Sequence, residues 1–179
     1  MGGGIVVNSV VGQGSVFTLR AALPMADEAR AAERLPAPRV VRLRSGLRVL
    51  IAEDNRTNMM IVRKMLSADV ATLVEACNGA EVVDMYRADP PDLVLMDVSM
   101  PIRNGLEATR DIRAHEAAHA LPHCPVVALT ANAFGEDREA CRLAGLDGFL
   151  VKPLSRADLL AEIARHCPDI SYPRRVIGL

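Results

Sequence analysis

The clearest shortage in this sequence is of aromatic residues, which make up 3% of the 179 residues and include no Trp. Half of the residues are nevertheless hydrophobic, so a core of aliphatic side chains can be buried. No apolar run approaches the roughly 20 residues that a membrane-spanning helix needs. The first residues, MGGGIVV, also lack the basic segment with which a signal peptide begins. The composition therefore predicts a cytoplasmic protein that makes no membrane contact.

The sequence also lacks a charge imbalance and paired cysteines. Its formal net charge of −1 gives no electrostatic reason to expect binding to nucleic acid or to an acidic membrane surface. No C-x-x-C pair occurs among the cysteines, which are Cys77, Cys124, Cys141 and Cys167. This spacing is typical of reduced thiols in a cytosolic protein, and it argues against a disulfide framework or a cysteine zinc site.

From Arg48 onward, short apolar runs alternate with helical patterns. Continuous runs of Val, Leu and Ile predict parallel strands buried on both faces, and repeated strand–helix units predict a doubly wound α/β domain. The expected strands lie within RVLIAED, ATLVEAC, DLVLMDV, PVVALTA and GFLVK. The expected helices lie near residues 56–67, 79–88, 105–116, 135–144 and 156–166.

The residues before this domain have a different character. Two β-rich runs in residues 4–23 flank Gly12 and Gly14, which can take the positive φ angles of a tight turn, so we expect a hairpin. An isolated hairpin is only marginally stable in water, so this one is expected to be the edge of a larger sheet. The expected divisions are the hairpin at 1–24, a proline-punctuated linker at 25–46, the α/β domain at 47–167 and a tail at 168–179.

Polar side chains follow four of the predicted strands at their carboxyl ends. They are Glu53 and Asp54 after the first strand, Asp97 after the third, Thr130 after the fourth and Lys152 after the fifth. Because the carboxyl ends of parallel strands meet at one edge of the sheet, we expect these groups to lie together. Carboxylates gathered there would repel one another unless a cation such as Mg²⁺ joined them. Acids, a hydroxyl and an amine around Mg²⁺ predict phosphoryl transfer.

Three segments carry a resemblance to a known family: VLIAEDNRTN, LVLMDVSMPIRNGLEATRDIR and VVALTANAFGEDREACRLAGLDGFLVKPL. Together they resemble the receiver domain of two-component signalling, in the form found in hybrid sensor histidine kinases. The resemblance implies a flavodoxin-like five-stranded parallel sheet of strand order 2-1-3-4-5. It also implies a phosphorelay in which the partner is the phosphohistidine domain of a histidine kinase or a histidine phosphotransfer protein.

The resemblance further implies which residues hold the metal ion and the phosphoryl group. Asp97 would be the phosphorylated aspartate. Mg²⁺ would be bound directly by Asp54 and Asp97, through water by Glu53, and also by the carbonyl oxygen of Ser99.

The same resemblance implies a set of residues that respond to the phosphoryl group. Lys152 would pair with it, aimed by a cis bond to Pro153. Thr130 would turn inward to hydrogen-bond a phosphoryl oxygen. Phe149 stands at the position of the family's switch aromatic, which is often Tyr, and would follow Thr130 inward.

The N-terminal hairpin resembles a second family. The segment MGGGIVVNSVVGQGSVFTLRAALP is similar to the last hairpin of a histidine kinase ATP-binding domain, which ends G-x-G-S-x-F-x-x-x-x-P. In that family the nucleotide-binding elements come earlier in the chain and would precede Met1. The resemblance therefore implies the C-terminal part of a hybrid kinase that lacks its ATP site, with a receiver that promotes its own phosphorylation and dephosphorylation.

Two other functions are weighed against the receiver. The motif HEAAH at residues 115–119 matches the zinc-protease pattern H-E-x-x-H, but it falls at the end of a predicted helix, away from the phosphorylation edge. A chance match is therefore favoured over a metalloprotease. The second alternative is a receiver-fold docking module without phosphorylation, against which the intact set of polar groups argues.

Overall fold

The computed structural model describes residues 3–22, 43–131 and 135–168. Most of the linker expected at 25–46 and nearly all of the tail expected at 168–179 lie outside the described residues. The chain divides into two compact units, residues 1–40 and 41–179, which are described separately. Within the described residues, none of the helices is both long enough and apolar enough to cross a bilayer.

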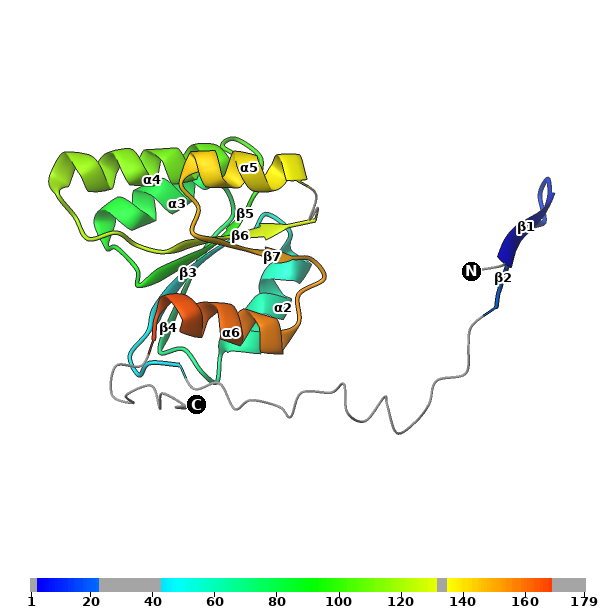
Figure 1. Cartoon of the computed structure of the whole chain (residues 1–179), viewed down its shortest axis with the longest axis horizontal. Coiled ribbons are helices and arrows are strands. Elements are labelled where there is room, and N and C mark those ends of the chain that lie inside the picture. The colour runs from blue at the N-terminus through cyan, green and yellow to red at the C-terminus, as the bar shows by residue number, and fades with distance from the viewer. Residues whose placement is uncertain (1–2, 23–42, 132–134, 169–179) are drawn as a thin grey trace, which may run out of the picture. The chain divides into compact units, whose positions relative to one another are not determined.

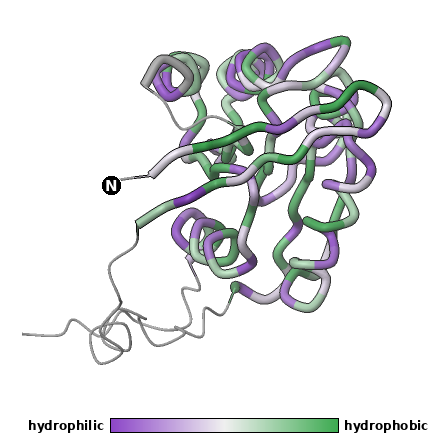
Figure 2. The backbone as a smooth tube through the Cα atoms, turned by 90° about the vertical axis from the view of Figure 1, so that its right-hand side faces the viewer, coloured by the Kyte–Doolittle hydropathy of each residue, from purple (hydrophilic) through white to green (hydrophobic). Residues whose placement is uncertain are grey.

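The first unit is an antiparallel hairpin, as the sequence predicts. Strand β1 (Gly3–Val10) pairs with β2 (Gly14–Ala21) along its whole length, and Gly12 takes a φ of +79° in the turn. Hydrophobic stretches run along both strands (Figure 2), yet every strand residue is exposed. An exposed, two-stranded hydrophobic ribbon has little core of its own, so its sequence suits a place within a larger sheet.

The second unit is built on a five-stranded parallel sheet in the order β4-β3-β5-β6-β7. Its strands are β3 (Arg48–Ala52), β4 (Thr72–Ala76), β5 (Leu93–Asp97), β6 (Val126–Thr130) and β7 (Gly148–Val151). Numbered within the domain, this is the predicted order 2-1-3-4-5. The central strands β5 and β6 are buried at every position, which explains their uninterrupted apolar runs.

Helices cover both faces of the sheet (Figure 1): α3, α4 and α5 lie on one face, and α2 and α6 lie on the other. Their bounds are α2 Arg56–Leu66, α3 Gly79–Ala88, α4 Gly105–His119, α5 Gly135–Ala144 and α6 Arg156–His166. Successive strand residues point to opposite faces, so Val49 and Ile51 join the α2/α6 core while Leu50 joins the α3/α4 core. The only helix to depart clearly from its expected range is α4, which ends at His119 rather than near Glu116.

Asparagine caps fix where two of the helices begin. Asn55, directly after Asp54, accepts hydrogen bonds from the backbone N–H groups of Thr57 and Asn58. Asn104 and Glu107 form a reciprocal capping box at the start of α4. Each cap satisfies N–H groups that the helix itself leaves unpaired, and so marks the start of the helix.

Candidate functional site

Three carboxylates converge at the carboxyl edge of the sheet. Asp97 ends β5, and Glu53 and Asp54 follow the neighbouring strand β3. One oxygen from each lies within 4.8 Å of the others. Glu53 and Asp97 are buried, whereas Asp54 is exposed. Among the described residues this is the one group of three or more potential metal-ligating side chains that come together, and it is the group that the sequence predicts.

Lys152, which directly follows the outer strand β7, reaches the two buried carboxylates at the same edge of the sheet. Its Nζ donates hydrogen bonds to Glu53 Oε2 at 2.6 Å and to Asp97 Oδ2 at 2.8 Å. Burial alone would lower the pKa of Lys152, but the hydrogen bonds and charges of the two carboxylates outweigh burial and raise it. Lys152 is therefore a fixed positive charge between two acids. Its bond to Pro153 is cis, as the resemblance implies.

Further contacts hold the two buried carboxylates in place. The backbone N–H of Ser99 donates to Asp97 Oδ1 at 3.1 Å, so both oxygens of that carboxylate have a donor. The side-chain amide of Asn58 donates to Glu53 Oε1 at 2.9 Å. Sequence reasoning assigned no role to Asn58, although its place in the first turn of the helix after the acidic pair could have indicated one.

Gly105 brings helix α4 into direct contact with the acceptor strand. A Cβ at this position would lie 2.2 Å from the carbonyl oxygen of Asp97 and 2.9 Å from a side-chain atom of Met96. Real Cβ atoms do not approach other atoms so closely, so only glycine allows the first turn of α4 to pack here. The backbone N–H of Gly105 also donates to the carbonyl oxygen of Val98 at 3.1 Å, which ties the start of α4 to the end of β5.

Thr130 and Phe149 lie on one face of the sheet, on neighbouring strands. The register pairs Ala128 with Phe149 and Thr130 with Val151, and residues two apart on a strand point the same way. Thr130 is buried beside the acidic edge, and its backbone carbonyl accepts the N–H of Lys152 at 2.7 Å. The Thr130 hydroxyl and the Phe149 ring, both predicted as site groups, are thus close neighbours on one face of the sheet.

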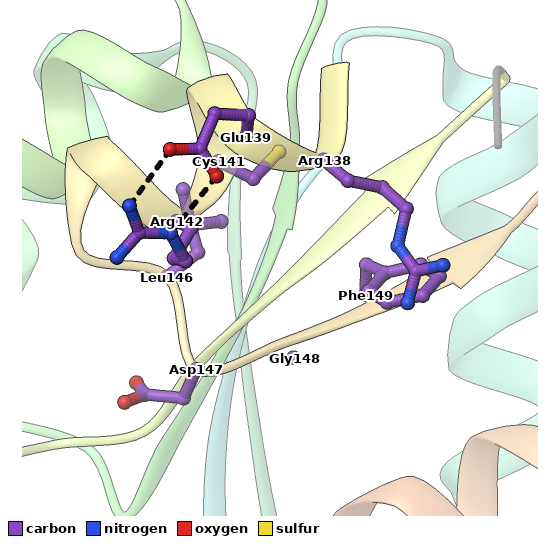
Figure 3. A pocket seen from close by; sticks show the side chains of 8 residues that line it. All are labelled: Arg138, Glu139, Cys141, Arg142, Leu146, Asp147, Gly148 and Phe149. Carbon is purple, nitrogen blue, oxygen red and sulfur yellow. Dashed lines mark hydrogen bonds and ion pairs between the residues drawn. The ribbon is translucent and has the colours of Figure 1, made fainter. Parts of the chain in front are cut away.

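Arg138 of α5 covers Phe149. Its guanidinium carbon lies 3.9 Å from the centre of the aromatic ring, within the range of a cation–π interaction (Figure 3). The pair lines a cavity of about 370 Å³ between α5 and β7. Arg142 lines the same cavity but binds both oxygens of Glu139 instead. Sequence reasoning missed Arg138, because nothing in the pattern of α5 says which of its arginines faces β7.

A second, smaller hollow of about 220 Å³ adjoins the acidic cluster. Apolar side chains line one side of it, and Glu53, Asn58 and Lys152 line the other. The apolar lining residues are Ile61, Val62, Pro153 and Leu154. Met60 is exposed nearby on α2, at 62%. A partner that reaches the acidic cluster would therefore meet an apolar surface beside it.

The HEAAH motif lies at the other end of the domain, in the last turns of α4. Its glutamate, Glu116, is buried and accepts hydrogen bonds from the Tyr86 hydroxyl at 2.7 Å and the backbone N–H of Cys124 at 2.9 Å. Arg113 binds both of its oxygens. Its Oε1 already accepts three of these hydrogen bonds, and Arg113 pairs with the buried group, so Glu116 is poorly placed to activate water. This arrangement disfavours a zinc protease on structural grounds.

Comparison with known sequences places this geometry in a family context. The family described as "Response regulator receiver domain" matches residues 49–164. Sensor protein GacS of Pseudomonas syringae is 37% identical over 137 residues, covering 73% of this chain and 15% of that protein. The aerobic respiration control sensor protein ArcB of Escherichia coli is 34% identical over 169 residues, covering 92% of this chain and 20% of ArcB. This chain thus spans a fifth or less of these relatives.

Two solved structures are similar in both sequence and shape. The receiver domain of sensor histidine kinase PA1611 from Pseudomonas aeruginosa, which holds a magnesium ion in its active site cleft, is 35% identical with a TM-score of 0.62. The alignment covers 69% of this chain and 98% of that domain. The receiver domain of Saccharomyces cerevisiae Ssk1, solved with the histidine phosphotransfer protein Ypd1, is 29% identical with a TM-score of 0.64. That alignment covers 68% of this chain and 89% of that one.

Proposed function

This chain belongs to the response regulator receiver domain family, and we propose that it accepts a phosphoryl group from a phosphohistidine onto Asp97. The observation that carries the proposal is the convergence of Asp97 with two further carboxylates and Lys152 at the carboxyl edge of the sheet. Among these groups Asp97 is the one at the end of the central strand β5, held at both oxygens by donors.

The residues of the site suit attack by a carboxylate on phosphorus. An oxygen of Asp97 forms the new bond to phosphorus, while the bond from phosphorus to the histidine nitrogen breaks and its electron pair stays on the imidazole. Lys152, already hydrogen-bonded to Asp97, can pass to an oxygen of the arriving phosphoryl group without leaving the site. The Thr130 hydroxyl would donate to another phosphoryl oxygen.

The acidic cluster also suits Mg²⁺. Carboxylate oxygens are the ligands that Mg²⁺ prefers, and three of them lie within 4.8 Å of one another here. We propose direct ligation by Asp54 and Asp97, ligation through water by Glu53, and a further ligand from the Ser99 carbonyl. The bound ion would supply positive charge to the phosphoryl oxygens. The similar PA1611 receiver, which holds magnesium in its active site cleft, supports this assignment.

The proposed partner is a domain that carries phosphohistidine, either in a histidine kinase or in a histidine phosphotransfer protein. The apolar hollow beside the acidic cluster, with Ile61 and Leu154, supports docking at this edge, since a partner must bring its histidine to Asp97. The similarity to the Ssk1 receiver, which was solved with a phosphotransfer protein, supports the same class of partner.

We further propose that this chain is part of a hybrid sensor histidine kinase located in the cytoplasm. Similarity to ArcB extends over 92% of the chain, which is more than the receiver domain alone. The hairpin of β1 and β2 would be the last two strands of the kinase ATP-binding domain. All four cysteines are free thiols, which suits a reducing compartment.

Phosphorylation would be read out through the face formed by α5 and β7. When Thr130 turns toward the phosphoryl group, space opens beside Phe149, which lies on the same face of the sheet. Phe149 would then move inward and leave the Arg138 guanidinium. The surface offered by α5 and β7 would thereby differ between the two states.

Intact mass after treatment with acetyl phosphate tests the central proposal. We expect a gain of one phosphoryl group that requires Mg²⁺ and is absent from Asp97→Asn. The control is Asp84→Asn, which alters an exposed carboxylate on α3 and should leave labelling unchanged. Full labelling of Asp97→Asn would contradict the assignment, as would a lack of labelling from both acetyl phosphate and a phosphohistidine partner.

A further inference from the structure

The histidines of the HEAAH motif form a pair that the proposed function does not use. His115 and His119 are one helical turn apart at the end of α4, with ring centroids 4.2 Å apart and planes tilted by 40°. The acceptor site contacts the other end of this helix, at Gly105. The pair is therefore separate from the acidic cluster.

The orientation of His119 is fixed by a backbone contact. Its Nδ1 lies 3.0 Å from the carbonyl oxygen of His115. A carbonyl oxygen can only accept, so Nδ1 carries the hydrogen, and in the neutral ring Nε2 holds the free lone pair. Metal-binding histidines commonly use this arrangement, in which a hydrogen bond to one ring nitrogen sets the tautomer and frees the other nitrogen to bind the ion.

His115 is held beside Tyr86 of α3, with which it makes an edge-to-face contact at 6.3 Å between centroids. Partial burial, followed by the charges of His119 and Arg87, lowers the pKa of His115. This shift favours the neutral imidazole, which is the form that binds metals.

The spacing of the rings suits one shared ion. Zinc binds histidine nitrogen at about 2.0–2.1 Å, so two nitrogens in tetrahedral coordination lie about 3.3 Å apart. The two rings lie side by side with centroids 4.2 Å apart, so rotation about their side-chain bonds can bring one nitrogen of each to a shared ion. The carbonyl end of the helix dipole, at His119, also favours a cation, while the nearby Arg87 opposes it.

We propose that His115 and His119 form a binding site for a transition-metal ion that prefers imidazole, namely Zn²⁺, Ni²⁺ or Cu²⁺, with water completing the coordination. Mg²⁺ prefers oxygen ligands, so the imidazole pair would favour these transition metals over Mg²⁺. The site has two protein ligands, because the acidic cluster is the one larger ligand group in the described residues. We expect no hydrolytic activity from it, since Glu116 is buried and engaged by Tyr86, Arg113 and Cys124.

Calorimetric titration of the full chain with Zn²⁺ near pH 7, after removal of metals by a chelator, tests the proposal. We expect binding that weakens by at least about tenfold in both His115→Ala and His119→Ala, because each removes one of two ligands. His166→Ala is the matched control, since His166 also ends a helix but contacts Glu162 and should leave the binding unchanged. His119→Gln keeps a polar side chain of similar size and provides a second variant if His119→Ala folds poorly.

Further variants test whether zinc binds at other potential ligands instead of at the histidine pair. Asp97→Asn changes the acidic cluster, and Cys77→Ser removes the exposed thiol. If these variants lose zinc binding while His119→Ala and His119→Gln keep it, the proposal is wrong. Absence of any zinc binding by the unmodified chain would also overturn it. Labelling by acetyl phosphate with Mg²⁺ is expected to remain in His119→Ala, so failure of this site is distinguishable from failure of the receiver function.

Discussion

Lys152 donates a 2.8 Å hydrogen bond to Asp97, a residue 55 positions earlier in the chain. The same ammonium group binds Glu53, so before phosphorylation it compensates two buried carboxylates. The structure shows Lys152 holding the two carboxylates in place. Under the proposed function, Lys152 would then also pair with a phosphoryl group on Asp97.

Removal of Lys152 should therefore affect stability as well as phosphorylation. In Lys152→Ala, Glu53 and Asp97 lose their shared cation, and we expect the free energy of unfolding without Mg²⁺ to fall by about 1–3 kcal/mol. Mg²⁺ binding should persist, since its proposed ligands remain, while labelling by acetyl phosphate should slow. Urea denaturation with and without Mg²⁺ measures the first effect. Lys64→Ala, an exposed change on α2, is the control. Loss of Mg²⁺ binding in Lys152→Ala would show that Lys152 has a different role.

Addition of Mg²⁺ should stabilise the folded chain through the acidic cluster. A ligand that binds only the folded state raises the free energy of unfolding by about 2.7 kcal/mol at a concentration one hundred times its Kd. Asp54→Ala should lose most of this increase, because Asp54 is a proposed direct ligand. Asp84→Asn should retain it. Thermal unfolding with Mg²⁺ and with EDTA measures the difference, and equal stabilisation of Asp54→Ala and the unmodified chain would exclude Asp54 as a ligand.

The fold and the core of the site could be predicted because both depend on local pattern and on one topological rule. Buried parallel strands such as β5 show as continuous apolar runs, and parallel strands bring Glu53, Asp97 and Lys152 to one edge wherever they stand in the sequence. The expected order of strands and the cis bond before Pro153 came from the resemblance, and the structure confirms both.

Contacts that depend on how a helix is rotated could not be predicted in this way. The α5 segment offers Arg138 and Arg142, and only packing against β7 determines that Arg138 stacks on Phe149. The burial of Glu116 has a similar cause, since its partners come from α3 and from the loop before β6. The extension of α4 to His119 reflects an alanine-rich end that continues the helix until Ala120 takes a left-handed conformation.

The stacking of Arg138 on Phe149 should favour the outward position of the ring. An exposed cation–π contact is worth about 0.5–1 kcal/mol, so Arg138→Ala should raise the inward population of Phe149 by about two- to fivefold. Fluorine NMR of the chain labelled with fluorophenylalanine, with Phe149→Leu to assign the signal, measures this population with and without beryllofluoride. Arg142→Ala is the matched control, because Arg142 binds Glu139 instead of the ring. Identical Phe149 signals in Arg138→Ala and the unmodified chain would show that the contact has no influence.

Glu116 should make the stability of the domain depend on pH in the acid range. Burial alone would raise the pKa of Glu116, but hydrogen bonds from Cys124, Tyr86 and Arg113 outweigh burial and lower it. A carboxylate whose pKa is lower in the folded state stabilises that state above its unfolded pKa of about 4.3. This contribution is lost as the pH falls through the folded pKa.

Glu116→Gln should therefore unfold with a weaker pH dependence below about pH 4.3, and at pH 7 its free energy of unfolding should fall by about 1–3 kcal/mol. Glu139→Gln is the matched comparison. The pKa of Glu139 is also lowered, by its hydrogen bond with Arg142, but both side chains are exposed to water. Solvent screens such a pair, so its loss should change stability little. Urea denaturation across this pH range measures both variants, and equal pH profiles for Glu116→Gln and the unmodified chain would show that the buried network does not control acid unfolding.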